Sequence, residues 1–178
     1  MSTVIGVTSA GGVAIVGDRV VASGGHVRSR SRQHVFDAGR VGFAVVAADV
    51  GGVADRLSSE IRAYRTERGD LDIDPLARMA SDLAAEFDAT LLLAARDDDG
   101  RPALRAVAAD GGVTADDVAA FGSGAPVALG VLEAGHDPDA RRGGDARPRR
   151  ALGGRGAGRR HGDRPRQLPA VRVIVQFG

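Results

Sequence analysis

The sequence contains no cysteine and no lysine, and aromatic residues make up only 3% of it. Without cysteine, a disulfide framework and thiolate metal sites are excluded. The few aromatic residues leave a nucleic-acid site without stacking platforms. Four histidines are scattered without the spacing of metal ligands, so we expect neither a metal nor another cofactor; they are His26, His34, His136 and His161.

The N-terminus lacks the signals that direct a chain to a membrane. It has no basic stretch and no long apolar run, so we predict no signal peptide, no membrane span and a cytoplasmic location. The chain of 178 residues is long enough for one domain with a sizeable core.

The net charge of +1 conceals a strong asymmetry along the chain. Residues 1–140 hold 13 arginines against 21 acidic residues, a net −8, whereas residues 141–178 hold 11 arginines against two aspartates, a net +9. The acidic, lysine-free body is typical of a GC-rich genome and compatible with a high-salt cytosol. Residues 141–168 have no apolar period and are rich in Arg, Gly and Pro, which predicts disorder or loose coil.

Apolar periodicity in the body predicts alternating strands and helices. Residues 3–8 and 13–18 form a hairpin whose apolar residues occupy both parities, so we expect both faces to be buried. Residues 41–48 predict another such strand, and residues 90–95 and 103–108 flank a turn at 97–100. A β-pattern returns at residues 170–177, and we assign 169–178 to the same domain as a late strand.

Two helices are predicted between these strands. The first shows apolar residues at helical spacing and ends at Gly69; they are Val53, Leu57, Ile61 and Tyr64. Asp74 and Pro75 predict the N-cap and first turn of the second. Its expected buried face comprises Leu76, Met79, Leu83 and Phe87. Strands, two helices and further strands in this order indicate helices packed outside a pair of sheets.

The start of the chain carries a candidate catalytic group. Removal of Met1 would leave Ser2 as the N-terminal residue, with a hydroxyl nucleophile and an α-amine base in one place. The hairpin would bring Asp18 back beside Ser2. A Met-Ser start and a Gly-Gly turn are each common in proteins, so an ordinary hairpin without a catalytic role is one interpretation. The hairpin that ends in Gly17-Asp18 makes the catalytic interpretation competitive with it.

Several segments in order and spacing resemble the proteasome β-type subunits, an N-terminal-nucleophile hydrolase family, and archaeal members in particular. The resemblance covers about residues 2–140. It rests on the hairpin and on segments 23–27 (SGGHV), 32–36 (RQHVF), 42–48 (GFAVVAA), 121–126 (FGSGAP) and 129–133 (LGVLE). It implies an α+β fold, a four-layer α-β-β-α sandwich.

The resemblance also implies a role for individual residues. Ser2 stands at the nucleophile and Asp18 at the orienting acid. The backbone N–H of Ala48 would form the oxyanion hole, and Ser123 would join the hydroxyl network around the amine. Val46 would line the pocket for the residue before the scissile bond, which suggests an apolar preference.

Two residues depart from the family pattern. Serine replaces the nucleophilic threonine and lacks the methyl group that stiffens its rotamer. His34 stands where the family has a catalytic lysine. The lysine supplies a permanent positive charge, whereas a histidine is charged only when its surroundings favour it. Three interpretations stay open: His34 substitutes for the lysine, the site is inactive, or His34 is a half-exposed strand residue without a role.

Three functions therefore compete. The first is a threonine-type endopeptidase, here with Ser2, that cleaves peptides or unfolded proteins and assembles into rings with its own copies or other proteasome-like subunits. The second is a catalytically inactive structural subunit of the same family. The third, which we rank low, is nucleic-acid binding by the Arg/Gly segment, because such a segment gives only salt-sensitive phosphate attraction.

The Arg/Gly segment has another explanation, a shifted reading frame over about residues 141–168. When codons 160–165 are read one base later, they permit Asp-Thr-Ala-Thr-Gly. This resembles the Asp-x-x-Ser/Thr-Gly motif of the family at its expected place. The chain as written lacks that acid and hydroxyl, so we expect it to be impaired in catalysis and stability.

Overall fold

A computed structural model describes residues 2–9, 12–23, 26–29 and 31–135. The segments predicted at 141–168 and 169–178 lie outside these residues. None of the helices in the described part is long and apolar enough to cross a membrane.

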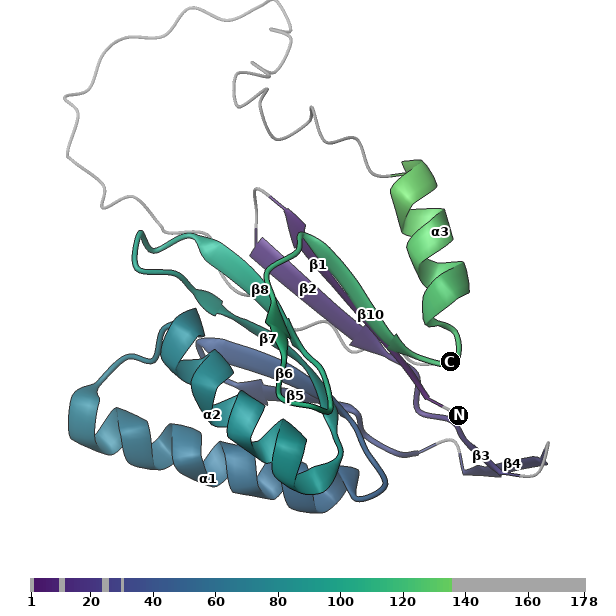
Figure 1. Cartoon of the computed structure of the whole chain (residues 1–178), viewed down its shortest axis with the longest axis horizontal. Coiled ribbons are helices and arrows are strands. Elements are labelled where there is room, and N and C mark those ends of the chain that lie inside the picture. The colour runs from purple at the N-terminus through teal and green to yellow at the C-terminus, as the bar shows by residue number, and fades with distance from the viewer. Residues whose placement is uncertain (1, 10–11, 24–25, 30, 136–178) are drawn as a thin grey trace, which may run out of the picture.

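The described residues form two antiparallel sheets with helices on their outer faces (Figure 1). One sheet has the strand order β5 (Val35–Ala38), β6 (Val41–Val46), β7 (Thr90–Arg96), β8 (Pro102–Val107) and β9 (Val113–Thr114). The other has the order β10 (Val118–Gly122), β1 (Thr3–Ser9) and β2 (Gly12–Gly17). A small separate hairpin is formed by β3 (Val21–Ser23) and β4 (His26–Ser29).

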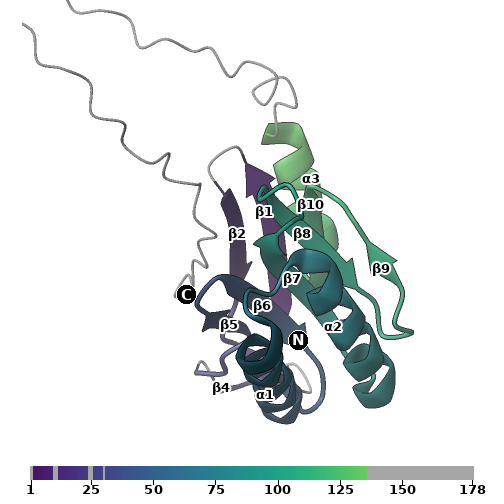
Figure 2. The ribbon, with the colours of Figure 1, turned by 90° about the vertical axis from the view of Figure 1, so that its left-hand side faces the viewer.

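Helices α1 (Val50–Arg68) and α2 (Ile73–Phe87) cover the five-stranded sheet, and α3 (Ala125–Gly135) packs on β10 and β1 (Figures 1 and 2). The side chains of β7 show the layering, because Leu91 and Leu93 join the core under the helices while Leu92 joins the core between the sheets. The other large residues of the inter-sheet core are Val4, Val13, Ile15, Val35 and Leu104. This arrangement is the α-β-β-α sandwich expected from the sequence.

The β1–β2 hairpin has one buried face and one half-buried face. Val4, Val13 and Ile15 are fully buried between the sheets. The opposite face is only half-buried, which corrects the expectation that both faces are buried; its apolar residues are Ile5, Val7, Ala14 and Val16. The difference arises because α3 covers this sheet along β10 and β1.

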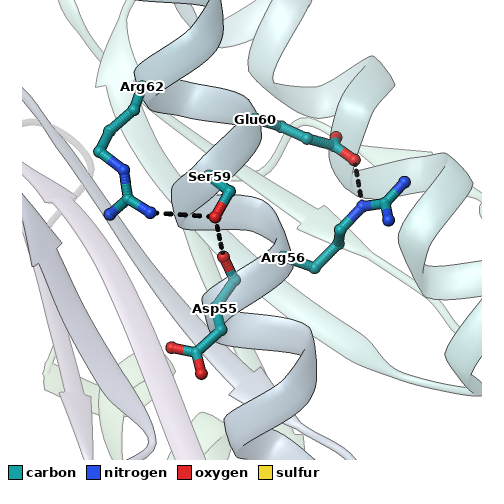
Figure 3. Close-up of polar contacts among 5 residues, drawn as sticks. All are labelled: Asp55, Arg56, Ser59, Glu60 and Arg62. Atoms are coloured by element: carbon teal, nitrogen blue, oxygen red, sulfur yellow. Dashed lines mark hydrogen bonds and ion pairs between the residues drawn. The ribbon is translucent and has the colours of Figure 1, made fainter.

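Helix α1 begins and ends close to where its sequence predicts. The side chain of Asp49 accepts a hydrogen bond from the N–H of Gly52 at 3.0 Å, and Gly69 at φ +88° ends the helix by donating to Arg65. The exposed face is polar, with Arg56 bonded to Glu60, and with Ser59 donating to the carbonyl of Asp55 and accepting from Arg62 (Figure 3). The hydrogen bond that Arg56 donates to the carboxylate of Glu60, together with that negative charge, raises the pKa of Arg56.

Helix α2 begins earlier than predicted, and the last residue of its predicted buried face is exposed. It begins at Ile73 with Asp72 at the N-cap, so Pro75 is its third residue, where a missing N–H still costs no intrahelical bond. Leu76 and Leu83 are buried as predicted, but Phe87 is 38% exposed. Phe87 is the last residue of the helix, which ends there because Asp88 adopts a left-handed conformation.

Candidate active site

The strand register decides which hydroxyl at the start of β1 belongs to the inter-sheet face. Val4 and Gly6 are buried on that face, so Ser2 shares their parity and Thr3 does not. The hydroxyl of Thr3 accepts a hydrogen bond from the N–H of Gly124 at 3.1 Å, just before α3. Thr3 is therefore tied to α3, and Ser2 is the hydroxyl residue on the inner face.

The end of β10 holds Ser2 in place. The N–H of Ser123 donates to the carbonyl of Ser2 at 3.2 Å, extending the pairing of β1 with β10. Gly122 has a φ of +100°, and a Cβ atom there would overlap the carbonyl oxygen of Ser2. The predicted site residue Ser123 is thus next to Ser2, and its backbone makes the contact.

Asp18 lies beside the start of β1, as the hairpin predicted. Strand β2 ends at Gly17, one residue earlier than expected, and the N–H of Asp18 donates to the carbonyl of Thr3 at 3.0 Å. The Oδ1 atom of Asp18 is buried and has no hydrogen-bond partner among the described residues. Unpaired buried polar atoms are costly and are often found where a site binds or reacts.

His34 is buried, which excludes the half-exposed strand residue considered from the sequence. Only 2% of it is exposed, and its Nδ1 atom lies 2.9 Å from the carbonyl oxygen of Val45. Its own carbonyl accepts from the N–H of Val45 at 2.9 Å. Its Nε2 atom is buried without a partner in the described part of the chain, so His34 and Asp18 do not hydrogen-bond to each other.

Ala48 lies between the end of β6 and the start of α1. Strand β6 ends at Val46 rather than at the expected residue 48, and Ala48 is exposed in the turn before the N-cap Asp49. Its carbonyl oxygen accepts from Nη2 of Arg32 at 2.8 Å. Val46 is half-buried and packs at the margin of the inter-sheet core.

Arg32 is the site residue that the sequence did not single out. Its backbone N–H donates to the carbonyl of Arg19 at 3.2 Å, while its guanidinium holds the carbonyl of Ala48. It therefore links the segment after Asp18 with the turn that carries Ala48. The only sequence signal was the basic residue two positions before His34.

The described residues include no cluster of three potential metal ligands. What the fold brings together at one end of β1 is a hydroxyl residue and a buried carboxylate oxygen, and the Cβ atom of the buried His34 lies close to Gly17 of the neighbouring strand. The turn of Ala48 is connected to this end through Arg32.

Two facing sheets between helical layers define the α-β-β-α sandwich class, and the comparisons with known proteins specify it further. The family model "Proteasome subunit" matches residues 1–142. The chain belongs to the proteasome subunit family.

Three curated relatives illustrate the similarity, which in each case covers 78% of this chain. "Proteasome subunit beta 1" of Hyperthermus butylicus is 28% identical over 147 residues, which are 72% of that protein. Proteins of the same description from Haloterrigena turkmenica and Thermococcus onnurineus are 32% and 30% identical, over 60% and 71% of their lengths. The chain thus spans less than two thirds of the length of the Haloterrigena turkmenica protein, and the same holds for "Proteasome subunit beta" of Halorubrum lacusprofundi, of which it covers 59%.

Proposed function

We propose that this chain is a β-type proteasome subunit that hydrolyses peptide bonds with Ser2 as its N-terminal nucleophile. The observation that carries the proposal is that Ser2 lies at the start of β1 and on its inner face. The N–H of Ser123 donates to the carbonyl of Ser2, and the N–H of Asp18 donates to the carbonyl of the next residue, Thr3. The similarity to archaeal β subunits supports it.

The proposed chemistry is attack of the Ser2 hydroxyl on the carbonyl carbon of a peptide. The backbone N–H of Ala48 stabilises the resulting oxyanion, aided by the N-terminus of α1, where the helix dipole favours negative charge. The carboxylate of Asp18 orients the charged groups around Ser2. Val46 contributes to the pocket before the scissile bond and favours an apolar side chain there.

The proposed substrates are peptides or unfolded proteins, degraded in the cytoplasm. The proposed partners are further copies of this chain or other proteasome-like subunits, assembled into rings. These proposals rest on the family similarity, and the chain spans only part of the length of its relatives.

A second function, a catalytically inactive structural subunit, is favoured by one observation. His34, which the family resemblance puts in the position of the catalytic lysine, forms no ion pair among the described residues. The nucleic-acid interpretation depends on the Arg/Gly segment, which lies outside the described residues.

Peptide hydrolysis by the purified full chain separates the two functions. We expect the mature chain to begin at Ser2 and to cleave fluorogenic peptides with an apolar residue before the scissile bond. Ser2→Ala should abolish turnover, while Ser59→Ala on the exposed face of α1 should leave it unchanged (Figure 3). A folded, assembled chain with a free Ser2 and no turnover would establish the structural subunit instead.

A further inference from the structure

Arg32 holds two different segments of the chain, one with its backbone and one with its side chain. Its N–H donates to the carbonyl of Arg19 at 3.2 Å, and Nη2 of its guanidinium donates to the carbonyl of Ala48 at 2.8 Å. Arg19 directly follows Asp18, and Ala48 lies in the turn between β6 and α1. The guanidinium therefore acts on the peptide backbone of the turn that carries the proposed oxyanion donor.

Consecutive hydrogen bonds connect this turn with the start of β1. The N–H of Asp18 donates to the carbonyl of Thr3, the first residue of that strand. The next residue, Arg19, accepts from Arg32, and the side chain of Arg32 reaches Ala48. The Ala48 turn is thus tied by named contacts to the end of the strand at which the proposed nucleophile lies.

The contact with Ala48 restrains geometry more than it stabilises the fold. A guanidinium that donates to a carbonyl makes a charge-assisted hydrogen bond, which is shorter and stronger than one between neutral groups. Ala48 is exposed, so water can take the place of the guanidinium at its carbonyl. Because the carbonyl would not be left buried and unpaired, loss of the bond should cost little stability.

Helix α1 holds the same turn from its other side. The side chain of Asp49 accepts from the N–H of Gly52 at 3.0 Å, and its carbonyl accepts from the N–H of Val53 at 3.3 Å. The carbonyl of Ala48 and the N–H of Asp49 belong to one planar peptide group. Two rotatable backbone bonds separate that group from the N–H of Ala48, so fixing the carbonyl limits where this N–H can point.

We propose that Arg32 is a positioning residue, whose hold on the carbonyl of Ala48 fixes the direction of the Ala48 N–H. This rests on the proposed function, in which that N–H stabilises the oxyanion. A donor stabilises an oxyanion only when it already lies where the charge forms, and a displacement of about 1 Å can cost about 10²-fold in rate. Arg32 acts through Ala48 and touches neither the substrate nor the reacting atoms.

Peptide hydrolysis by variants of the full chain tests this role. Methionine has an unbranched stem but no donor, so Arg32→Met should lower kcat about 10–10²-fold. The KM and the unfolding midpoint should change little, because the substrate pocket and the core keep their side chains. Arg32→Lys keeps a charged donor without the planar fork and should recover part of the loss.

Arg40→Met is the matched control. Arg40 is exposed, pairs with Asp70 at 2.6 Å and precedes β6, whereas the Ala48 turn follows that strand. This variant removes the same charge and should leave kcat unchanged. A wild-type kcat in Arg32→Met, or an equal loss in Arg40→Met, would overturn the proposal, and so would a loss in Arg32→Met that lies in KM alone.

The Ala48 amide reports the geometry without requiring activity. In a full chain labelled with ¹⁵N-alanine, its NMR resonance is identified by its absence from Ala48→Gly. We expect Arg32→Met to shift this resonance and Arg40→Met to leave it in place. An unchanged resonance in Arg32→Met would overturn the proposal. A wild type without peptide turnover would count against the proposed function, and the NMR comparison would still decide whether Arg32 positions Ala48.

Discussion

Gly122 is the residue on which the position of Ser2 depends most directly. Its φ of +100° is a conformation that residues with side chains rarely adopt, and a Cβ atom would overlap the carbonyl oxygen of Ser2. The next residue donates the hydrogen bond that holds that carbonyl. Strain introduced at Gly122 must therefore be relieved by moving Ser2 away from β10.

We predict that Gly122→Ala destabilises the fold by about 1–3 kcal/mol and displaces Ser2. Chemical denaturation and reaction with an electrophilic peptide probe would measure the two effects. Gly130→Ala is the matched control, because Gly130 lies within α3 with open space around it. It should stabilise the protein by about 0.5–1 kcal/mol, and equal effects of the two substitutions would refute the account of Gly122.

The two long helices differ in how their N-termini are capped. Asp49 accepts a hydrogen bond from the N–H of Gly52 at 3.0 Å, whereas Asp72 makes no side-chain capping bond to α2. The Asp49 cap also ends the turn that carries Ala48. Losing it affects both the stability of α1 and the orientation of the Ala48 amide.

Asp49→Ala should therefore cost about 1 kcal/mol of stability, and Asp72→Ala should cost clearly less. Urea titrations followed by circular dichroism would compare the two. Both aspartates are exposed, so each variant loses one exposed negative charge. A difference in stability between the two variants therefore reports the capping hydrogen bond and not the loss of charge. A larger loss of stability in Asp72→Ala than in Asp49→Ala would mean that the hydrogen bond from Gly52 to Asp49 does not stabilise α1.

Elements with strong apolar periods were predictable, and those set by distant contacts were not. The repeat from Val53 to Tyr64 and Gly69 located α1 within a few residues. The start of α2 was misplaced because Asp74-Pro75 looks like a cap, although Asp72 occupies that position. β10 is short and only partly buried, so its pattern is weak, and its pairing with β1 joins residues more than 100 positions apart.

In the candidate site, too, some residues could be predicted from the sequence, and contacts between distant segments could not. Ser2 and Asp18 were named from the N-terminal hairpin and Ser123 through the family resemblance, and the hairpin register explains why Asp18 meets Thr3. The contact of Arg32 with Ala48 could not be foreseen, because it depends on how two turns from different parts of the chain approach each other. Likewise, no sequence pattern predicts that Val45 fixes the ring of His34.

At the scale of the whole molecule, α3 exposes an apolar face. Val127 and Val131 are four residues apart and are 74% and 68% exposed. We predict that the chain self-associates and that Val127→Glu with Val131→Glu yields smaller species in light scattering. Val113→Glu on β9 is the control for added charge. A wild type that stays monomeric at all concentrations and salt levels would contradict this prediction.

The match to the family model ends at residue 142, close to the point where the composition changes. We predict that residues near 141–168 arise from a shifted reading frame, and that the restored frame encodes an Asp-x-x-Ser/Thr-Gly motif. Resequencing the gene decides the question. A confirmed uninterrupted frame, together with near relatives that carry the same Arg/Gly segment, would refute it.

The proposed function depends on Ser2 being the nucleophile of a peptidase site. The most direct measurement is covalent labelling by an electrophilic peptide probe, with the modified residue located by mass spectrometry. We predict a chain that begins at Ser2 and carries one probe on that residue, with no labelling of Ser2→Ala and normal labelling of Ser59→Ala. A folded chain with a free Ser2 that stays unlabelled, or that is labelled elsewhere, would contradict the claim.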